Sequence, residues 1–346
     1  MKYGILLMTI TSLTFFSCKK EKIDEPIPAT SFTADANGIY ICNEGTFTGG
    51  NSTITYTTGT ESETIHDVYK IANNENLGDV GQSMTKIGNK IYIVVNNSSK
   101  VEVVDEITLK KSATISGFNS PRFLIEARPG KAYVTDLYAN GISIVDLTSN
   151  TITGTINLNG STEDLILHNG KVYVTNLSTS YLYIIEPNTD VVEDSVLIGP
   201  GGNSLQLDAN NKLWILCGGD FITGAAGSLH RVDPSSKSVE LSLTFPAGNY
   251  PTRLTINETN NEIYFLDMNV YKMQLSDLTL PSSPLIDAAG KSFYGMAFDE
   301  VNRVLYVTDA IDYQQAGRIY RYDPTGTLLN SLPAGIIPGE VLFLNN

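Results

Sequence analysis

The sequence predicts an all-β protein, a seven-bladed β-propeller with four antiparallel strands in each blade. Three observations support this prediction. A short phrase, in which an apolar residue and an aromatic precede β-branched residues and often Asn or Asp, recurs seven times at spacings of 40 to 52 residues. Each interval has room for four strand-like runs, which is the make-up of a propeller blade. The chain also ends in a lone strand-like run.

The seven copies share a central aromatic residue that marks the second strand of each blade. These residues are Tyr40, Tyr92, Tyr133, Tyr173, Trp214, Tyr264 and Tyr306. The third unit shows all four runs, RFLIEA, KAYVTDL, GISIVDL and TITGTINL. Alternating positions rich in Val, Ile, Thr and Tyr are typical of half-buried strands, and Asp followed by small polar residues is typical of a hairpin turn.

The two ends of the chain predict how the ring closes. The first unit begins at Asn37 with its second strand, because nothing before it resembles RFLIEA. The final run, PGEVLFLNN, matches the first strand of the other units, so we expect it to complete blade 1 and to leave no open sheet edge there. The predicted domains are a signal peptide at residues 1–17, a flexible tether at 18–36 and the propeller at 37–346.

The N-terminal segment, MKYGILLMTITSLTFFSC, has Lys2 before an apolar run and Ser17 before Cys18. This pattern is typical of a secretory signal peptide. Its end resembles a bacterial lipoprotein signal, which implies lipid attachment at Cys18; the alternative is an ordinary signal peptide with an incidental cysteine. The acidic residues of the tether resemble those of surface lipoproteins, so the expected location is the outer membrane, lipid-anchored and exposed on the cell surface.

The composition excludes one class of partner. The chain has 23 Lys and Arg residues against 37 Asp and Glu, a formal charge of −14. A nucleic-acid-binding protein needs a basic stripe along the backbone it tracks, so no nucleic acid partner is expected. Apart from Cys18, only Cys42 and Cys217 remain, both in apolar runs, and we expect two buried free thiols. The propeller is expected to be a monomeric domain.

The repeats YVTD at Tyr133–Asp136, YVTN at Tyr173–Asn176 and YVTD at Tyr306–Asp309 resemble those of YncE-like, YVTN-repeat surface-layer propellers. The phrases IYICNEGTFTGGNSTITYTT and PRFLIEARPGKAYVTDL are similar to a Bacteroidetes family of surface propeller lipoproteins with a domain of unknown function. That family includes the BtuG-like vitamin B12 capture lipoproteins. The resemblance implies corrinoid capture for a TonB-dependent outer-membrane transporter.

The predicted binding site lies on the face where the first strands begin, because function on a propeller is carried by the loops around the channel. Alignment of the units gives a polar ring that differs from blade to blade. Three long loops and the neighbouring rim add aromatic residues, which provide contact area at little entropic cost. The predicted ligand-binding residues are Phe47, Gln82, Arg122, Tyr138, Glu163, Asn203, Phe221, Tyr250, Arg253, Tyr294 and Tyr313.

Two alternatives stay open for this face: channel ends that hold only water, and aromatic rings that pack onto their own loops. A corrinoid would meet the rim through stacking and amide hydrogen bonds, with Arg122 or Arg253 at its phosphate. The same face would also suit a glycan or a protein partner.

The sequence gives little support for catalysis, and a non-enzymatic protein without cofactor or metal is expected. His66, His168 and His230 are not placed to pair with a Ser or Cys at the rim. Glu163, Asp164 and Glu340, with Asn203, form the one set that would suit Ca²⁺, as in lactonase-like hydrolases. Asp194–Val196 resembles a short O-glycosylation acceptor of Bacteroidetes; an ordinary edge strand is the alternative.

Overall fold

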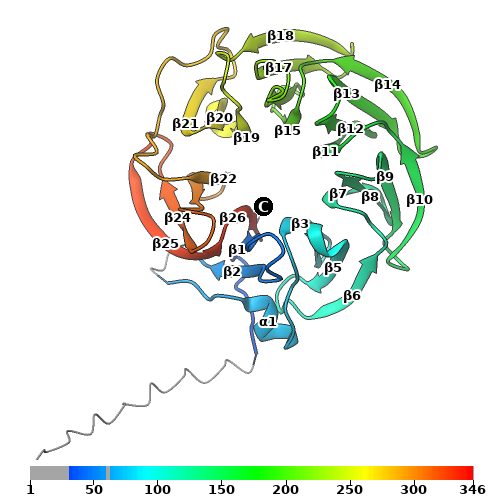
Figure 1. Cartoon of the computed structure of the whole chain (residues 1–346), viewed down its shortest axis with the longest axis vertical. Helices are drawn as coiled ribbons and strands as arrows, with labels where there is room; N and C mark the ends of the chain where they lie inside the picture. The colour runs from blue at the N-terminus through cyan, green and yellow to red at the C-terminus, as the bar shows by residue number, and fades with distance from the viewer. Residues whose placement is uncertain (1–30, 60–62, 346) are drawn as a thin grey trace, which may run out of the picture.

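The computed structural model describes residues 31–59 and 63–345. Within them, seven antiparallel sheets stand around a central opening (Figure 1). The predicted seven-bladed β-propeller is therefore confirmed. The signal peptide predicted at residues 1–17 and the lipid attachment at Cys18 lie outside the described residues.

Five blades have the predicted four strands, which follow one another in chain order from the channel to the outside. Blades 2 and 3 consist of β3 (Gly81–Ile87), β4 (Lys90–Val95), β5 (Lys100–Asp105), β6 (Lys111–Ser116), β7 (Pro121–Arg128), β8 (Lys131–Asp136), β9 (Gly141–Asp146) and β10 (Thr151–Asn157). Blades 4 and 5 consist of β11 (Thr162–His168), β12 (Lys171–Asn176), β13 (Tyr181–Glu186), β14 (Val191–Leu197), β15 (Gly202–Leu207), β16 (Leu213–Cys217), β17 (Ser228–Asp233) and β18 (Ser238–Thr244). Blade 7 consists of β22 (Phe293–Asp299), β23 (Val304–Asp309), β24 (Ala316–Tyr322) and β25 (Leu328–Ile336).

Blade 1 joins the two ends of the chain as predicted. Its inner strand is the C-terminal β26 (Pro338–Phe343), followed by β1 (Ile39–Asn43) and β2 (Thr53–Thr57). The register places Ile41 opposite Val341 and Tyr40 opposite Leu342. The backbone N–H of Leu344 donates to the carbonyl of Gly38 at 3.0 Å, which extends the pairing beyond β26.

Blades 1 and 6 do not have the four strands that the repeat predicted. Blade 6 has β19 (Thr252–Asn257), β20 (Glu262–Asp267) and β21 (Asn269–Gln274). The segment after β21 forms an isolated bridge between Ile286 and Val270 instead of a fourth strand. That segment contains Pro281 and Pro284, which cannot donate to a strand ladder. In blade 1, an isolated bridge between Tyr56 and Ile65 takes the place of an outer strand, and the short helix α1 (Val68–Asn73) follows it. Two 3₁₀ turns, Asn96–Ser98 and Glu258–Asn260, complete the helical elements that the structure describes.

The hydrophobic core is divided among the spaces between neighbouring blades. One cluster, for example, joins Val94 and Val103 of blade 2 to Leu124 and Val134 of blade 3. The seven aromatic residues of the repeat all lie in second strands and are buried. Because both faces of each sheet are covered, the second strands consist of buried residues along their length, as KAYVTD in β8 shows. Cys42 and Cys217 are buried free thiols, as predicted.

The packed structure begins upstream of the predicted boundary at residue 37. Phe32 and Ala34 are buried, and the ring of Phe32 lies 5.1 Å from that of Tyr56 and 6.2 Å from that of Tyr40. These residues were assigned to the flexible tether because the segment lacks a strand pattern, yet apolar side chains without such a pattern still bury surface. Among the described helices, none has the length and apolar character needed to cross a membrane.

Candidate functional site

A repeated backbone irregularity aims side chains into the channel. The first strand of each blade shifts register against the second at its mouth end, for instance between Pro121 and Leu124, between Thr162 and Leu165, and between Phe293 and Met296. A bulge of this kind re-aims a side chain and is common beside functional sites. The channel-facing residues of the predicted ring sit at these bulges.

The Thr of the YVT repeat stabilises the bulge in three blades. Its hydroxyl accepts the exposed backbone N–H: Phe123 N donates to Thr135 at 3.0 Å, Asp164 N to Thr175 at 2.9 Å, and Gly295 N to Thr308 at 2.7 Å. The Asp or Asn that follows ties the adjacent loops together, as Asp136 does by accepting from the backbone of Ser120 and Tyr138. The YVTD/N repeat is therefore a scaffold motif that holds the rim, and its residues are distinct from those that line the cavity.

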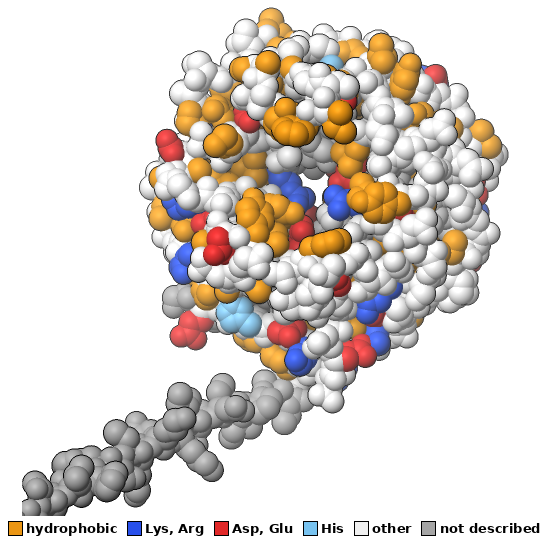
Figure 2. Space-filling model, viewed as in Figure 1, with side chains coloured by type: hydrophobic (Ala, Val, Ile, Leu, Met, Phe, Trp, Pro, Cys, Tyr) orange, Lys and Arg blue, Asp and Glu red, His pale blue; other side chains and the backbone are white. Residues whose placement is uncertain are grey.

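A cavity of about 300 Å³ opens at this face of the channel. It is lined by polar and aromatic side chains of blades 3 to 7. These are Arg122, Phe123, Glu163, Asn203, Ser204, Thr252, Arg253, Phe293, Tyr294 and Tyr313. A deeper cavity of about 200 Å³ continues down the channel to Asp164 and Glu340, and a lateral one of about 450 Å³ shares Phe293 and Tyr313. Figure 2 shows Lys and Arg side chains at the edge of the central opening, with hydrophobic side chains around it.

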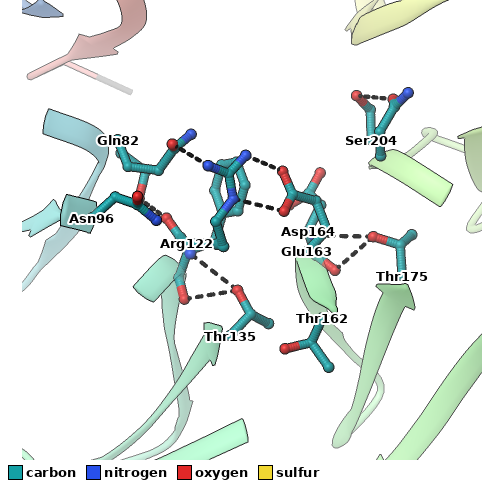
Figure 3. A network of polar contacts seen from close by, with 12 residues as sticks. Gln82, Asn96, Arg122, Thr135, Thr162, Glu163, Asp164, Thr175 and Ser204 are labelled. Atoms are coloured by element: carbon teal, nitrogen blue, oxygen red, sulfur yellow. Dashed lines mark hydrogen bonds and ion pairs between the residues drawn. The ribbon is translucent and has the colours of Figure 1, made fainter. Parts of the chain in front are cut away.

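Arg122 is held in a tight network across three blades (Figure 3). Its Nε donates to Glu163 Oε2 at 2.7 Å and its Nη2 to Glu163 Oε1 at 2.5 Å, and Nη1 donates to Gln82 Oε1. The side chains of Arg122 and Glu163 are 20% and 6% exposed. Burial opposes the charge of Arg122, but Glu163 outweighs it and the pKa of the guanidinium is raised. The guanidinium of Arg122 is thus occupied by Glu163 and Gln82.

Arg253 lines the same cavity but makes different contacts. Its Nε donates to the carbonyl of Tyr294 at 3.1 Å, and its guanidinium carbon lies 5.5 Å from the centre of the Tyr294 ring. The Tyr294 hydroxyl in turn donates to Glu44 Oε1 at 2.8 Å. Among the described residues, no carboxylate lies within ion-pair distance of Arg253.

Two carboxyl groups lie deeper in the channel. Burial raises the pKa of Asp164 to about 7 and that of Glu340 to about 7; for Glu340 the nearby Arg253 opposes the rise. Asp164 accepts from the backbone N–H of Leu205 at 2.8 Å. Both carboxyls line the deeper cavity with Asn203, as the ring alignment predicted. In the part of the chain that the structure describes, no three His, Cys, Asp or Glu residues are grouped to hold a metal ion.

We expect Glu340→Gln to stabilise the protein at high pH and not at low pH. The pKa of Glu340 is about 7 in the folded protein against about 4.5 in the unfolded chain, so the folded state binds more protons between these values. The stability that the protonated Glu340 side chain retains is therefore lost as the pH rises from about 4.5 to about 7, because the buried carboxyl becomes charged. Gln does not ionise and so avoids this loss. Thermal melts should show the variant about 3 kcal/mol more stable at pH 8, equivalent to several degrees, and equal to wild type near pH 4. Glu63→Gln removes an exposed carboxyl and serves as the control; a pH-independent effect of Glu340→Gln would contradict the assignment.

The aromatic residues of the rim divide into three groups. Phe221 is 81% exposed and its ring lies 5.6 Å from that of Tyr250. Tyr294 and Tyr313 form an edge-to-face pair at 5.9 Å within the cavity wall. Phe47 and Tyr138, 72% and 71% exposed, stand on their own loops outside the cavity lining. Phe221 with Tyr250 and Tyr294 with Tyr313 thus form two pairs, whereas the rings of Phe47 and Tyr138 are exposed to solvent.

Sequence reasoning missed Glu44 and Phe293. Glu44 follows the Asn43 that ends the YICN copy of the repeat, where two YVT copies have Leu137 and Leu177 and the third has Ala310. A charged residue in place of a repeated Leu was a usable signal. Phe293 is the residue immediately before Tyr294 and is turned into the cavity by the bulge.

None of the three histidines lines the mouth cavity or the deeper one. His230 contacts two serines, Nε2 with Ser228 Oγ at 2.8 Å and Nδ1 with Ser242 Oγ at 2.8 Å, because they are its neighbours within and across the strands of blade 5. The residues are inside the blade, where burial lowers the pKa of His230 to about 4 and raises that of the Cys217 thiol to about 11. At neutral pH the imidazole is therefore uncharged and the thiol un-ionised within a buried cluster.

Asp194–Val196 lies on β14, the outermost strand of blade 4, and Ser195 is exposed there. Asp194 Oδ2 accepts from Lys237 Nζ of the next blade at 2.8 Å. The segment is therefore part of an exposed edge strand, which was the alternative to an O-glycosylation acceptor.

Several solved structures have a similar fold. A quinonprotein alcohol dehydrogenase-like protein from Bacteroides thetaiotaomicron aligns with 18% identity and a TM-score of 0.71, covering 90% of this chain and 79% of the other. Hydrazine synthase from Kuenenia stuttgartiensis aligns with 14% identity and a TM-score of 0.58, covering 75% and 88%. Apo AztD from Citrobacter koseri aligns with 11% identity and a TM-score of 0.55, covering 88% and 98%. At these identities the similarity shows the propeller fold alone.

No curated protein matches the sequence. The model of a protein family does match, over residues 37–334, which is nearly the whole propeller. The chain therefore belongs to the family described as domain of unknown function DUF5074.

Proposed function

We propose that this propeller is a non-enzymatic ligand-capture protein that binds at the channel mouth, and that its ligand is a corrinoid. The supporting observation is the pairing of a polar cavity with exposed rings around it: Arg253, Asn203 and Thr252 inside, and Phe47, Tyr138 and Phe221 above. Exposed apolar side chains gathered around a concave polar site are typical of binding surfaces.

A corrinoid suits this surface because of its shape and chemistry. It is a broad, flat macrocycle fringed with amides, and a cavity of about 300 Å³ holds only a part of it. The ring would lie over the mouth, with rim aromatics against its edges and amides directed to Asn203, Ser204 and Thr252. The resemblance to surface lipoproteins adds a lipid anchor at Cys18 and delivery to a TonB-dependent transporter as parts of the same proposal.

A glycan is the second candidate, and the cavity size favours it. A single sugar unit is compact enough to enter the mouth whole, where Tyr313 offers a ring face and Glu163 and Asn203 offer hydrogen-bond partners. The two candidates differ in how much of the rim they use, because a sugar inside the cavity leaves Phe221 uncovered.

Calorimetric titration of residues 31–346 with cyanocobalamin tests the proposal. We expect saturable heat, and about tenfold weaker binding for Phe221→Ala, which loses one stacking ring and touches little else. Val301→Ala removes an exposed apolar side chain elsewhere on the molecule and should bind like wild type. Absence of heat with cyanocobalamin would discard the corrinoid, and a glycan array would follow. Unchanged cyanocobalamin affinity in Phe221→Ala would show that the rim is not part of the site.

A further inference from the structure

The two arginines of the cavity differ in what they have left to bind. Arg122 directs three of its nitrogens at Glu163 and Gln82. Arg253 uses Nε alone, on a backbone carbonyl, and its two terminal nitrogens have no hydrogen-bond partner among the described residues. Arg253 lines both the mouth cavity and the deeper one. A guanidinium with both terminal groups free is a fork that matches the two oxygens of a carboxylate or phosphate.

The backbone at Arg253 departs from that of the other blades. Arg253 has φ +57°, in the left-handed region, whereas none of the residues at the same ring position is in that region. Those residues are Ser83, Phe123, Asp164, Ser204, Gly295 and Glu340. In blade 6, Leu266 stands where blades 3, 4 and 7 have the Thr that caps the bulge, so Arg253 N lacks that acceptor. Blades 1, 2 and 5 also lack this Thr, with Cys42, Val94 and Leu216 in its place, but have no left-handed residue at the ring position. A non-glycine residue in this conformation costs about 1 kcal/mol or more, and such strain is concentrated at binding sites.

The surroundings hold the Arg253 side chain in place without neutralising it. Its face rests on Tyr294, whose hydroxyl is bonded to Glu44. The nearest acidic groups are Glu44 and, below, Glu340, and burial raises the pKa of both. Across the cavity, Arg122 and Glu163 cancel each other. The mouth therefore presents a cation that is held in place and, among the described residues, has no carboxylate within ion-pair distance.

We propose that Arg253 is the anchor for an anionic group, phosphate or carboxylate, of the ligand that enters the mouth cavity. This inference rests on the proposed function in so far as the mouth is the ligand site, and it does not depend on the ligand being a corrinoid. It narrows the ligands to those with an oxyanion that reaches the channel while the rest of the molecule contacts the rim.

The test follows the side-chain Nε–H signals of the arginines by NMR during titration with inorganic phosphate and, separately, with acetate at constant ionic strength. The Arg253 signal is assigned by its loss in Arg253→Gln. We expect it to move saturably with at least one anion while the Arg122 signal stays in place, and the anion that binds more tightly identifies the class. Arg303→Gln is the matched control, because Arg303 also has a left-handed backbone, φ +56°, and does not line the cavity.

Arg253→Gly separates folding from binding, since glycine suits this backbone and the variant should melt no lower than wild type. Its affinity for the anion, measured by calorimetry, should be at least tenfold lower than that of wild type. If the Arg253 signal moves with neither anion, the anchor is wrong, even where cyanocobalamin or a glycan still binds the mouth. If it moves saturably but cyanocobalamin gives no heat, the anchor stands and the corrinoid is discarded.

Discussion

Deleting residues 340–346 is expected to abolish folding of the propeller. The deletion removes most of β26, so β1 loses its inner partner and blade 1 keeps two strands. It also removes Val341, Phe343 and Leu344, which are buried in the cores on both sides of blade 1. Each such side chain contributes about 1.5–3 kcal/mol, and whole domains are stable by about 5–15 kcal/mol, so the loss is of the same order as the total.

Circular dichroism and size-exclusion chromatography measure this outcome. We expect aggregation, because an unpaired β1 edge is a template for other chains. Deleting only Asn345 and Asn346 leaves β26 intact and should give a wild-type melt. A deletion variant lacking residues 340–346 that stays monomeric with a cooperative melt would show that the closure is dispensable.

Arg122→Ala is expected to be the most destabilising single substitution at the mouth. It leaves the carboxylate of Glu163, 6% exposed, without its bidentate partner, and it leaves Gln82 without a donor. Breaking a buried ion pair costs about 3–5 kcal/mol, and the partial exposure of Arg122 reduces this to about 2–3 kcal/mol. The result is a drop of several degrees in the melting temperature.

The matched comparison is Arg253→Ala, which removes the same charge and side chain from the same cavity without breaking an ion pair. It should lower stability much less. The double variant with Glu163→Ala should recover part of the loss, since the stranded charge is then gone. Equal destabilisation by Arg122→Ala and Arg253→Ala would contradict this account of the network.

The repeat predicted the ring, the closure and the channel-facing positions because these depend on local pattern. The buried aromatic of each second strand is set by alternation, and the register of β26 follows from matching its pattern to the other first strands. The repeat predicted outer strands in blades 1 and 6 that the structure does not have. In blade 6, Pro281 and Pro284 override the pattern of the repeat.

At the site, six of the eleven predicted residues line the mouth cavity, but the sequence did not predict how they are paired. Gln82, Arg122 and Glu163 lie about one repeat apart, so their proximity follows from the alignment. Arg122 has an ionic partner, whereas among the described residues Arg253 has none; this follows from side-chain geometry and from the bulge between Thr252 and Thr255, which no spacing encodes. The contact between Tyr294 and Glu44 spans the closure of the ring, so it appears only once the ends are joined.

The pairing of β1 with β26 also sets a time requirement. Ile41 and its partner Val341 are separated by 341 − 41 = 300 positions, nearly the whole chain. At about 5–20 residues per second, a ribosome needs roughly 15–60 s to travel from one to the other. During that interval β1 has β2 on one side and nothing on the other, while blades 2 to 7 are already being made. The first blade to be started is therefore the last to be finished, and the nascent chain must keep its earliest edge from pairing elsewhere until its final residues arrive.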